Sequence, residues 1–334
     1  MKVAFVPAYG PPEVVGFKDL PTPEPKAGEL RIRVLATAVT AGDWRVRSGI
    51  MPRGFGVLRG LALGFGGPRK GVLGTDAAGV VDALGAGVTN FKVGDPAVAF
   101  PGSAMGAHAE FLIMPTMGRV AAKPSNLTFE EAVALPFGGM TALDFLRRGA
   151  VQPNERVLVN GAAGNVGSAS VQLAKHWGAH VTAVCRGANA ALVRSLGADE
   201  VIDYEKADFA SLGATFDVVV DTVGNAPYPR VKAVLAPGGR LLAILADLPA
   251  MIGSAFAGRA RKHRVVAGPA AERVEDLMEL AKLAQAGQFG PVIDSRFAFE
   301  RIADAYRVVD GGHKRGSVVV SLDPRSSERS AAGI

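Results

Sequence analysis

The sequence predicts an α/β protein in which a doubly wound parallel sheet is joined to a second, β-rich domain. Three observations lead to this fold class. Strands and helices alternate from about residue 155 onward, the first third of the chain is rich in short strands, and a glycine-rich turn follows the first strand of the alternating part. Such alternation is typical of a parallel sheet with helices on both of its faces.

The composition is that of a globular protein, with 334 residues, 49% hydrophobic and 20% charged. This length is enough for two domains with their own cores. The net charge is +6, but the basic residues are scattered except for "GRARKHR" at 258–264, so we expect no nucleic-acid partner. The single cysteine excludes a multi-cysteine metal site. The first residues do not resemble a signal peptide, and we expect a cytoplasmic location.

The first third contains the predicted β-rich domain. The stretches "KVAFVPA" and "ELRIRVLATAV" alternate apolar and polar residues, as half-buried strands do. The longer stretch "GTDAAGVVDALGAGVTNFKVGDPAVAF" is expected to form short strands separated by glycine and asparagine turns, as in a partly open barrel. In "PSNLTFEEAVAL", Thr128 followed by Glu131 is the pattern of a capping box and predicts the start of a helix.

The alternating part begins with three predicted strands, at 156–161, 180–185 and 200–204. Between them, "NVGSASVQLAKHWG" and "NAALVRSLG" predict helices, and "TFDVVVDTVG", "PRVKAVLAPGG" and "RLLAILA" continue the pattern. After about residue 270 the sequence predicts an amphipathic helix in "ERVEDLMELAKLAQAGQ" and two strands, in "PVIDSRFAF" and "GSVVVSL". Residues 323–334 have the composition of a disordered tail.

The glycine-rich turn has the pattern A-x-G-x-x-G between a strand and a helix, which is the context of a dinucleotide fingerprint. Gly164 would let the backbone approach the phosphates, and Gly167 would let helix and strand pack closely. The alternative is a tight turn without a ligand. The predicted cofactor-binding residues of the turn are Ala162, Ala163, Gly164, Asn165, Val166 and Gly167.

The residue after the second strand predicts which nicotinamide dinucleotide is bound. Folds specific for NAD place an Asp or Glu there to bind the ribose 2′-hydroxyl. This chain has Arg186, whose guanidinium suits a 2′-phosphate, so we expect NADPH. The alternative is an exposed arginine without this role. The preceding Cys185 is expected to be a small strand-end residue and not a nucleophile.

Several motifs in this order resemble one enzyme family over roughly residues 1 to 322. They include "AVTAGDWRVRSG", "LGTDAAGVV", "ALPFGGMTALDFL", "VLVNGAAGNVGSASVQLAK", "LVRSLGADEVIDY" and "DVVVDTVG". The chain resembles the zinc-independent medium-chain dehydrogenases/reductases of the quinone oxidoreductase-like, zeta-crystallin-like branch. The resemblance implies a GroES-like catalytic domain at 1–124 and 266–334, a Rossmann domain at 125–265, and a homodimer.

The same resemblance bears on metal binding. Zinc-dependent relatives have a cysteine where this chain has Thr40, and a His-Glu pair where it has Thr75 and Asp76. A catalytic zinc site takes three protein ligands, mostly nitrogen or sulfur, with an open position. Thr40, Thr75 and Asp76 cannot supply that set, so we predict no metal site.

Without a metal, hydrogen-bond donors must stabilise charge on a carbonyl oxygen. We predict Thr40 as the catalytic donor, with Arg45 or Arg47 as further candidates; the alternative is that the Thr40 hydroxyl caps a turn. By resemblance, Thr141 lies against the nicotinamide and Tyr204 beside the adenosine phosphate. Asn189 stands where several relatives have lysine, so the 2′-phosphate depends mainly on Arg186. Val223 and Gly224 complete the predicted cofactor-binding residues.

Together these features predict a zinc-independent oxidoreductase that transfers hydride from NADPH to a quinone or an α,β-unsaturated carbonyl compound. The alternatives are a zinc-free alcohol or aldehyde oxidoreductase with the same cofactor, and a non-enzymatic NADPH-binding protein. The apolar stretch 241–258 is expected to close the pocket rather than to span a membrane. A peripheral membrane contact through it and the basic residues Arg259, Arg261, Lys262 and Arg264 is the less favoured alternative.

Overall fold

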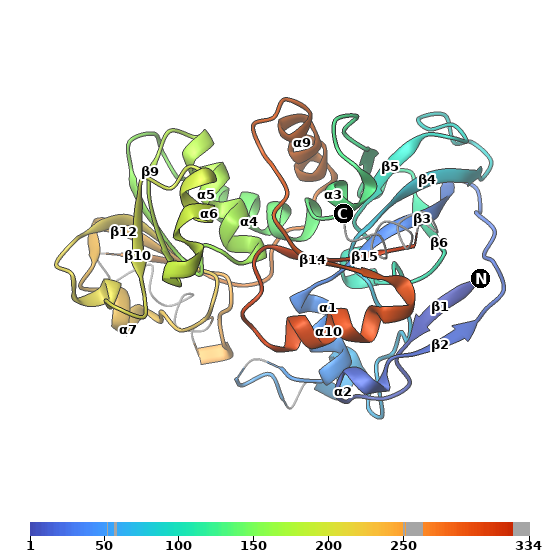
Figure 1. Cartoon of the computed structure of the whole chain (residues 1–334), viewed down its shortest axis with the longest axis horizontal. Helices are drawn as coiled ribbons and strands as arrows, with labels where there is room; N and C mark the ends of the chain where they lie inside the picture. The colour runs from blue at the N-terminus through green and yellow to red at the C-terminus, as the bar shows by residue number, and fades with distance from the viewer. Residues whose placement is uncertain (52, 57–58, 250, 252–262, 323–334) are drawn as a thin grey trace. The chain divides into compact units, whose positions relative to one another are not determined.

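The computed structural model describes residues 1–51, 53–56, 59–249, 251 and 263–322, which form two compact units (Figure 1). The β-rich unit comprises Met1–Ile50, Leu58–Phe137 and Glu272–Ile334, and the parallel-sheet unit comprises Met51–Val57 and Gly138–Ala271. The chain thus changes units at 50/51, 57/58, 137/138 and 271/272, whereas the sequence predicts changes at 124/125 and 265/266 only. The predicted tail, 323–334, and Arg259, Arg261 and Lys262 of the basic cluster lie outside the described residues.

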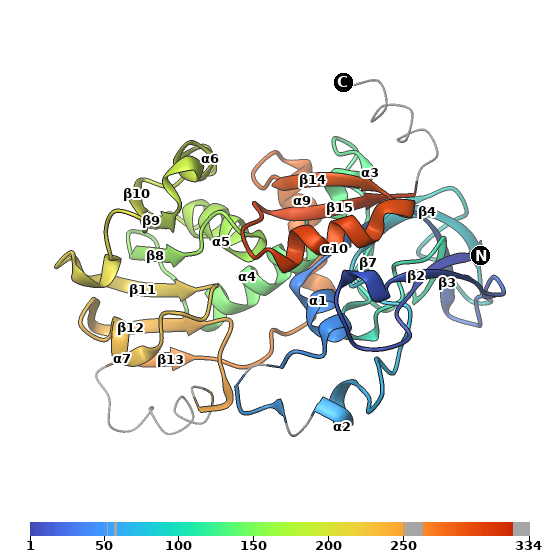
Figure 2. The same cartoon turned by 60° about the horizontal axis from the view of Figure 1, so that its bottom comes forward.

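A six-stranded parallel sheet forms the centre of the parallel-sheet unit. The strands are in the spatial order β10-β9-β8-β11-β12-β13, and every neighbouring pair is parallel (Figure 2). This is the strand order of a doubly wound dinucleotide-binding sheet, as the sequence predicts. The strands are β8 (Arg156–Asn160), β9 (His180–Cys185), β10 (Glu200–Asp203), β11 (Phe216–Asp221), β12 (Leu235–Ala243) and β13 (Arg264–Val266).

Helices cover both faces of this sheet, as its alternating side chains show. Leu241 packs in the core that includes Val231 of α7, whereas the next residue, Leu242, lies against Gly149, which follows α4. Successive residues of a strand point to opposite faces, so α7 and α4 cover opposite faces. The helices of this unit are α4 (Pro136–Arg148, which begins in the β-rich unit), α5 (Asn165–His176), α6 (Ala190–Ser195) and α7 (Tyr228–Val231), with short 3-10 turns η4 (Gly187–Asn189) and η5 (Phe209–Ser211).

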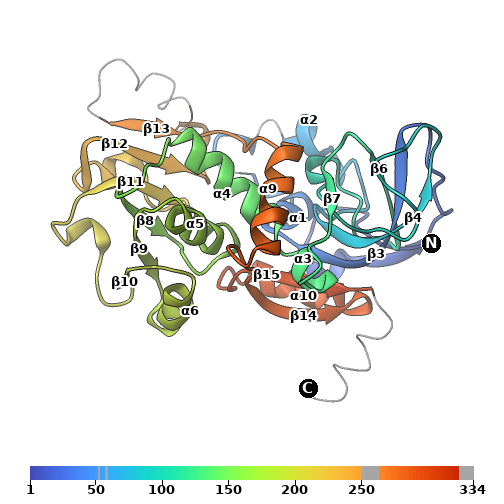
Figure 3. The same cartoon turned by 90° about the horizontal axis from the view of Figure 1, so that it is seen from above.

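The β-rich unit contains a seven-stranded sheet in which β15, near the end of the chain, pairs antiparallel with β3, near its start. A separate hairpin is formed by β1 and β2. Figure 3 shows β14 beside α3 and α10. The strands are β1 (Lys2–Phe5), β2 (Gly16–Asp19), β3 (Glu29–Val39), β4 (Ala77–Leu84), β5 (Pro96–Ala99), β6 (Phe111–Pro115), β7 (Val120–Ala122), β14 (Ile293–Ala298) and β15 (Ser317–Ser321).

The helices of the β-rich unit begin where the sequence provides caps. The predicted capping box is present: Thr128 Oγ1 accepts from the Glu131 amide at 3.2 Å, and Glu131 accepts from the Thr128 amide at 2.8 Å. The predicted amphipathic helix after residue 270 is α9. The helices are α1 (Ala41–Ser48), α2 (Arg59–Leu63), α3 (Phe129–Ala132), α9 (Val274–Gln285) and α10 (Ile302–Asp310), with short turns η1 (Pro12–Val14), η3 (Gly102–Ala104) and η6 (Phe299–Arg301). None of the helices described is long and apolar enough to cross a bilayer.

Candidate functional site

The glycine-rich turn closes tightly at the carboxyl end of β8. Gly161 has a φ of 81°, a backbone conformation that side chains other than glycine rarely adopt. The amides of Gly161 and Ala162 both donate to the carbonyl of Val184 in β9, at 3.1 and 3.0 Å. The Gly164 amide donates to the Gly161 carbonyl at 3.0 Å. The turn is therefore fixed to the sheet before α5 begins.

Gly164 and Gly167 have different surroundings, as the fingerprint predicts. A Cβ atom at Gly167 would lie 2.0 Å from the Gly161 carbonyl oxygen, so the helix approaches the strand more closely than any side chain allows. A Cβ at Gly164 would lie 3.4 Å from that oxygen and within 4 Å of no other atom outside its own chain neighbours and helix backbone. Gly167 thus serves packing, and Gly164 leaves the backbone accessible.

The N-terminus of α5 is suited to bind an anion. Gly164 is the N-cap residue and has no side chain to satisfy the first amides of the helix. The first amides of a helix have no acceptor within it, and the helix dipole favours negative charge at this end. A pyrophosphate would supply both the acceptors and the charge, which is the arrangement found in dinucleotide-binding folds. The residues present therefore fit a dinucleotide.

The loop after β11 meets the same turn. The Thr222 hydroxyl donates to the Asn160 carbonyl at 2.8 Å, so the carboxyl ends of β8 and β11 are joined. A Cβ at Gly161 would lie 2.6 Å from Val223 Cγ2, which shows how closely the two segments approach. Beside them, the predicted residue Gly224 has a φ of 86°. In open parallel sheets, ligands bind where the strand order reverses, which here is between β8 and β11.

Asp221 holds this loop and was not predicted from the sequence. Its Oδ1 accepts from the amides of Val223 and Gly224, each at 3.1 Å, and its Oδ2 accepts from the Ala226 amide at 2.9 Å. The side-chain amide of Asn160 donates to the same carboxylate at 2.9 Å. One buried carboxylate thus shapes the backbone next to the fingerprint turn. A strand that ends in Asp before Thr-Val-Gly was the available signal.

Arg186 and Tyr204 follow the ends of two neighbouring strands. The strands β9 and β10 are parallel, and Cys185 lies opposite Asp203. The residues that follow the two strands therefore lie side by side at the same edge of the sheet. The Tyr204 amide donates to the Cys185 carbonyl at 3.2 Å, and the Tyr204 side chain is exposed. Arg186 Nε lies 2.9 Å from Oε1 of Glu205, a residue that the sequence reasoning did not select.

Cys185 is buried, and burial raises the pKa of its thiol. A raised pKa leaves less thiolate, which is the nucleophilic form. The structure thus fits the expectation that Cys185 is a small strand-end residue. Nearby Asn189 ends η4, four residues after β9.

Thr141 lies in α4, close to the turn. A Cβ at Gly138 would lie 1.8 Å from Asn165 Oδ1, so this part of α4 packs directly against the start of α5. Residues three apart share a face of a helix, which places Thr141 on the same side of α4 as Gly138. The structure therefore brings Thr141 toward the residues of the fingerprint within one unit.

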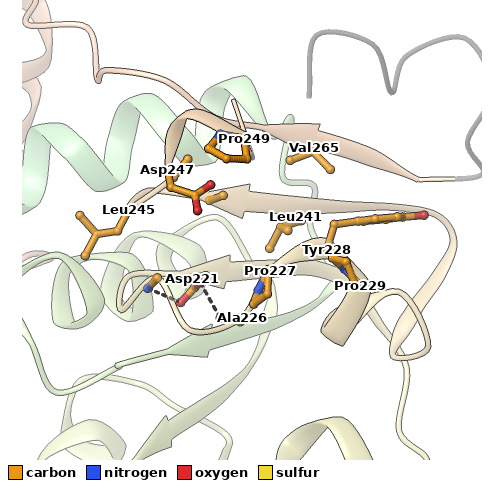
Figure 4. A pocket seen from close by; sticks show the side chains of 13 residues that line it. Asp221, Ala226, Pro227, Tyr228, Pro229, Leu241, Leu245, Asp247, Pro249 and Val265 are labelled. Carbon is orange, nitrogen blue, oxygen red and sulfur yellow. Dashed lines mark hydrogen bonds between the residues drawn. The ribbon is translucent and has the colours of Figure 1, made fainter. Parts of the chain in front are cut away.

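A pocket of about 370 Å³ lies beside the Asp221 loop (Figure 4). Figure 4 shows Tyr228, Leu241 and Val265 lining it, and Asp221 with its hydrogen bonds at one end. Of the apolar stretch expected to close the pocket, residues 241, 243, 245–247 and 249 line this one. Positions 250 and 252–258 of that stretch lie outside the described residues.

In the β-rich unit, Thr40 caps α1 and belongs to a buried chain of polar groups. Its hydroxyl accepts from the Asp43 amide at 3.3 Å and donates to Asp43 Oδ2 at 2.7 Å. It also lies 3.1 Å from the Thr75 hydroxyl, which in turn lies 2.5 Å from Asp76 Oδ2. Thr40 is only 1% exposed. The geometry matches the alternative that Thr40 caps a turn, and its catalytic role stays a prediction.

Within this chain of contacts, Asp76 is the carboxyl group whose pKa is shifted most from its usual value. Burial raises its pKa to about 8, and the nearby carboxylate of Asp43 acts in the same direction. The Thr75 hydroxyl, which donates to Asp76 Oδ2, and the Phe137 amide, which donates to Asp76 Oδ1 at 3.0 Å, lower the pKa and partly offset this effect. Burial is the larger influence and favours the neutral form of Asp76.

Arg47, a further candidate donor, is occupied by structural contacts. Its Nη2 donates to both oxygens of Asp310, at 2.6 and 2.7 Å, and its Nη1 donates to the Gly10 carbonyl at 2.5 Å. Its guanidinium lies 5.1 Å from the centre of the Tyr306 ring. These contacts tie α1 to α10, which fits a structural role for Arg47.

His108 is buried in the β-rich unit. Its Nε2 donates to the Ala38 carbonyl at 3.0 Å, because a carbonyl can only accept. Nδ1 lies 3.4 Å from the Tyr306 hydroxyl, which donates to it when the ring is neutral. Throughout the described part of the chain, no three His, Cys, Asp or Glu residues gather in a group that could hold a metal ion. Zinc independence nevertheless stays a prediction.

Comparison with known proteins agrees with this architecture. The model of the "Alcohol dehydrogenase GroES-like domain" matches residues 26–125, and that of "Zinc-binding dehydrogenase" matches residues 196–320. The "Chloroplast envelope quinone oxidoreductase homolog" of Arabidopsis thaliana is 31% identical over 316 residues, which cover 90% of this chain and 92% of that protein. This chain belongs to the quinone oxidoreductase-like medium-chain dehydrogenases/reductases.

Other members of this family extend the comparison. The "2-methylene-furan-3-one reductase" of Solanum lycopersicum is 31% identical, over 97% of this chain and 80% of its own length. The quinone oxidoreductase from Coxiella burnetii has the same fold, with a TM-score of 0.85, 28% identity, and coverage of 96% and 99% of the two chains. The predicted combination of a GroES-like domain with a Rossmann-type sheet is thus confirmed.

Proposed function

We propose that this quinone oxidoreductase-like protein transfers hydride from NADPH to a quinone or to an α,β-unsaturated carbonyl compound, without zinc. The observation that carries the proposal is the glycine-rich turn that begins α5 at the carboxyl ends of β8 and β11, where the N-cap residue Gly164 leaves room for the backbone to approach phosphates. The quinone oxidoreductases and the furanone reductase among its relatives support the two substrate classes.

The residues have separate parts in holding the cofactor. The backbone from Gly164 to Gly167 would bind the pyrophosphate, and Arg186 would bind the 2′-phosphate. Tyr204 would lie beside the adenosine and Thr141 beside the nicotinamide. When bound, NADPH supplies the hydride. The protein contributes position and exclusion of water, which convert a bimolecular encounter into an oriented one.

The hydroxyl of Thr40 is the proposed donor toward the substrate carbonyl. In the structure it donates to Asp43, so this role requires the hydroxyl to turn from the carboxylate to the substrate. Thr40→Ser keeps this hydroxyl and Thr40→Val removes it. If Thr40 is the donor, Thr40→Val lowers kcat much more than Thr40→Ser does. Equal kcat in both variants, with folding retained, would limit Thr40 to capping α1.

A substrate panel tests the proposed activity directly. The purified protein is mixed with NADPH and with quinones, enones, aldehydes and ketones in turn, and the loss of NADPH absorbance is followed with and without a zinc chelator. Turnover of quinones or enones that persists in chelator is the expected result. Turnover of aldehydes alone would favour the alcohol or aldehyde oxidoreductase. NADPH binding without any turnover would favour a non-enzymatic binding protein.

The remaining expectations concern assembly and location. The proposed homodimer is tested by light scattering of the purified protein, where a mass close to one chain would refute it. The proposed cytoplasmic location is tested by cell fractionation. Binding to anionic vesicles would instead favour the peripheral membrane contact.

A further inference from the structure

Arg186 faces a carboxylate where the proposed 2′-phosphate would bind. Its Nε lies 2.9 Å from Oε1 of Glu205, and the two side chains are 43% and 50% exposed. The two atoms are close, but Nε makes no aligned hydrogen bond. The pair is thus an ion pair at the surface, which contributes little stability and can be exchanged for another partner.

The backbone brings Glu205 to this position. The parallel register of β9 and β10 sets Asp203 opposite Cys185. Asp203 Oδ1 then accepts from the amides of both Gly187 and Glu205, at 3.0 and 3.1 Å. One carboxylate therefore joins the turn after Arg186 to the turn that carries Glu205. This link brings the backbones of Arg186 and Glu205 close enough for their side chains to meet.

The two charges favour different cofactors. A carboxylate at the end of the second strand of such a sheet accepts the 2′-hydroxyl of NADH, whereas an arginine there binds the 2′-phosphate of NADPH. In this protein the second strand supplies the arginine, and the third strand delivers a carboxylate to the same place. A 2′-phosphate that approaches Arg186 must displace Glu205 and is repelled by it.

We propose that Glu205 is a specificity-determining residue, which accepts the 2′-hydroxyl of NADH and opposes the 2′-phosphate of NADPH. The protein consequently binds both nicotinamide cofactors, and the Arg186–Glu205 pair sets the ratio of the two affinities. This inference rests on the proposed function, because it assumes that a nicotinamide dinucleotide occupies the site.

The test is the binding of four nucleotides, measured by calorimetry on the full chain. NADPH and NADH report on the complete cofactors, and 2′,5′-ADP and 5′-AMP isolate the presence of the 2′-phosphate. The decisive variant is Glu205→Gln, which keeps the size of the side chain and removes its charge. We expect about a 5-fold gain in affinity for NADPH and 2′,5′-ADP, and no gain for NADH and 5′-AMP.

A matched control is available on β10, the strand that precedes Glu205. Glu200→Gln makes the same change of charge at the amino end of β10, where Glu200 is opposite Thr182 of β9. It should leave the ratio of NADPH to NADH affinity unchanged. Arg186→Ala should lower NADPH affinity at least 10-fold with little effect on NADH. In the Arg186→Ala background, Glu205→Gln should still raise the affinity for NADPH, because Glu205 repels the 2′-phosphate whether or not Arg186 is present.

The outcomes separate this inference from the proposed function. An unchanged ratio in Glu205→Gln, with both cofactors bound, overturns the role of Glu205 and leaves the proposed function intact. An equal gain for all four nucleotides also overturns it, because the effect would then be a general one of charge. If the wild-type protein binds neither NADPH nor NADH, the proposed function itself is refuted.

Discussion

The hydroxyl oxygens of Thr40 and Thr75 lie 3.1 Å apart in the interior of the β-rich unit, and each is also within hydrogen-bond distance of a carboxylate. Thr40 donates to Asp43 Oδ2 at 2.7 Å, and Thr75 donates to Asp76 Oδ2 at 2.5 Å. The bond from Thr75 lowers the pKa of Asp76, but burial raises it more, and the pKa is about 8.

The protonation of Asp76 should make stability depend on pH. Its pKa is about 8 in the folded protein and about 4 in the unfolded chain, so between these values the folded state binds the extra proton. The free energy of unfolding should therefore fall as pH rises from about 4 to about 8, by at most about 1.4 kcal/mol per pH unit from this group.

Asp76→Asn isolates this effect. Asparagine is neutral at every pH, can donate to Thr75 and can accept from the Phe137 amide. Urea unfolding across that pH range should show the variant gaining stability relative to the wild type as pH rises. Parallel curves for the two proteins would mean that Asp76 does not titrate there. Thr75→Val, which interrupts the chain of hydroxyls, should destabilise the protein at all pH values.

Gly167→Ala and Gly164→Ala should separate folding from cofactor binding. The added methyl group at Gly167 collides with the Gly161 carbonyl, and we expect a loss of about 1–3 kcal/mol in unfolding free energy. At Gly164, φ is −73° and only one neighbour is near, so stability should change little. The Gly164 methyl group would face the bound phosphates and should weaken NADPH binding at least 10-fold. Denaturation and calorimetry on both variants measure the two effects, and the reverse pattern would refute the assigned roles.

Arg47→Met should destabilise the β-rich unit without acting through the cofactor. The change leaves Asp310 without its bidentate partner and the Gly10 carbonyl without its donor. Because Asp310 is partly exposed and can be hydrated, whereas the Gly10 carbonyl loses its donor, we expect a loss of about 1–3 kcal/mol in unfolding free energy. Thermal unfolding measures this loss, and Arg47→Lys should recover part of it. A variant with normal stability but greatly reduced kcat would instead show that Arg47 acts on the substrate.

Asp221→Ala should loosen the loop beside the fingerprint. The loss of acceptors for three amides and for Asn160 should cost about 2–4 kcal/mol in unfolding free energy. Nucleotide affinity should fall with it, because Val223 and Gly224 lose their fixed position. Thr222→Val is the matched control, since its hydroxyl makes one strong bond, to the Asn160 carbonyl, and should cost about 1 kcal/mol. Equal losses of stability and affinity in the two variants would contradict the role of Asp221 in holding the loop in position.

Much of the fold could be predicted because its signals are local. Three such signals are the apolar run at β8, the glycines of the turn and the capping box at Thr128. The residues that make up each of these signals are within a few positions of one another in the sequence. The start of β12 was not predicted correctly. The strand begins at Leu235, before the predicted strand "RLLAILA", and it pairs with β11. Pro237, Gly238 and Gly239 are residues typical of a turn, which hid this earlier start.

The parts of the site that could not be predicted depend on distant partners. Glu205 meets Arg186 only because β10 pairs with β9 in one particular register. Thr40 and Thr75 are 35 residues apart, and their contact depends on how α1 packs beside the segment before β4. Asp221 was visible as a strand end, but its four hydrogen bonds require the turn after β8 to be in place.

The link between the turns after β9 and β10 has a consequence for how this protein can change through evolution. The residues after Asp203 are tyrosine, glutamate and lysine, in that order. Loss of the codon for Glu205 would bring Lys206 to the place now taken by Glu205. The ion pair of Arg186 and Glu205 would thereby be replaced by two cations in one mutational step. If NADPH binds there as proposed, this change would strengthen the preference for NADPH over NADH without any change to the glycine turn.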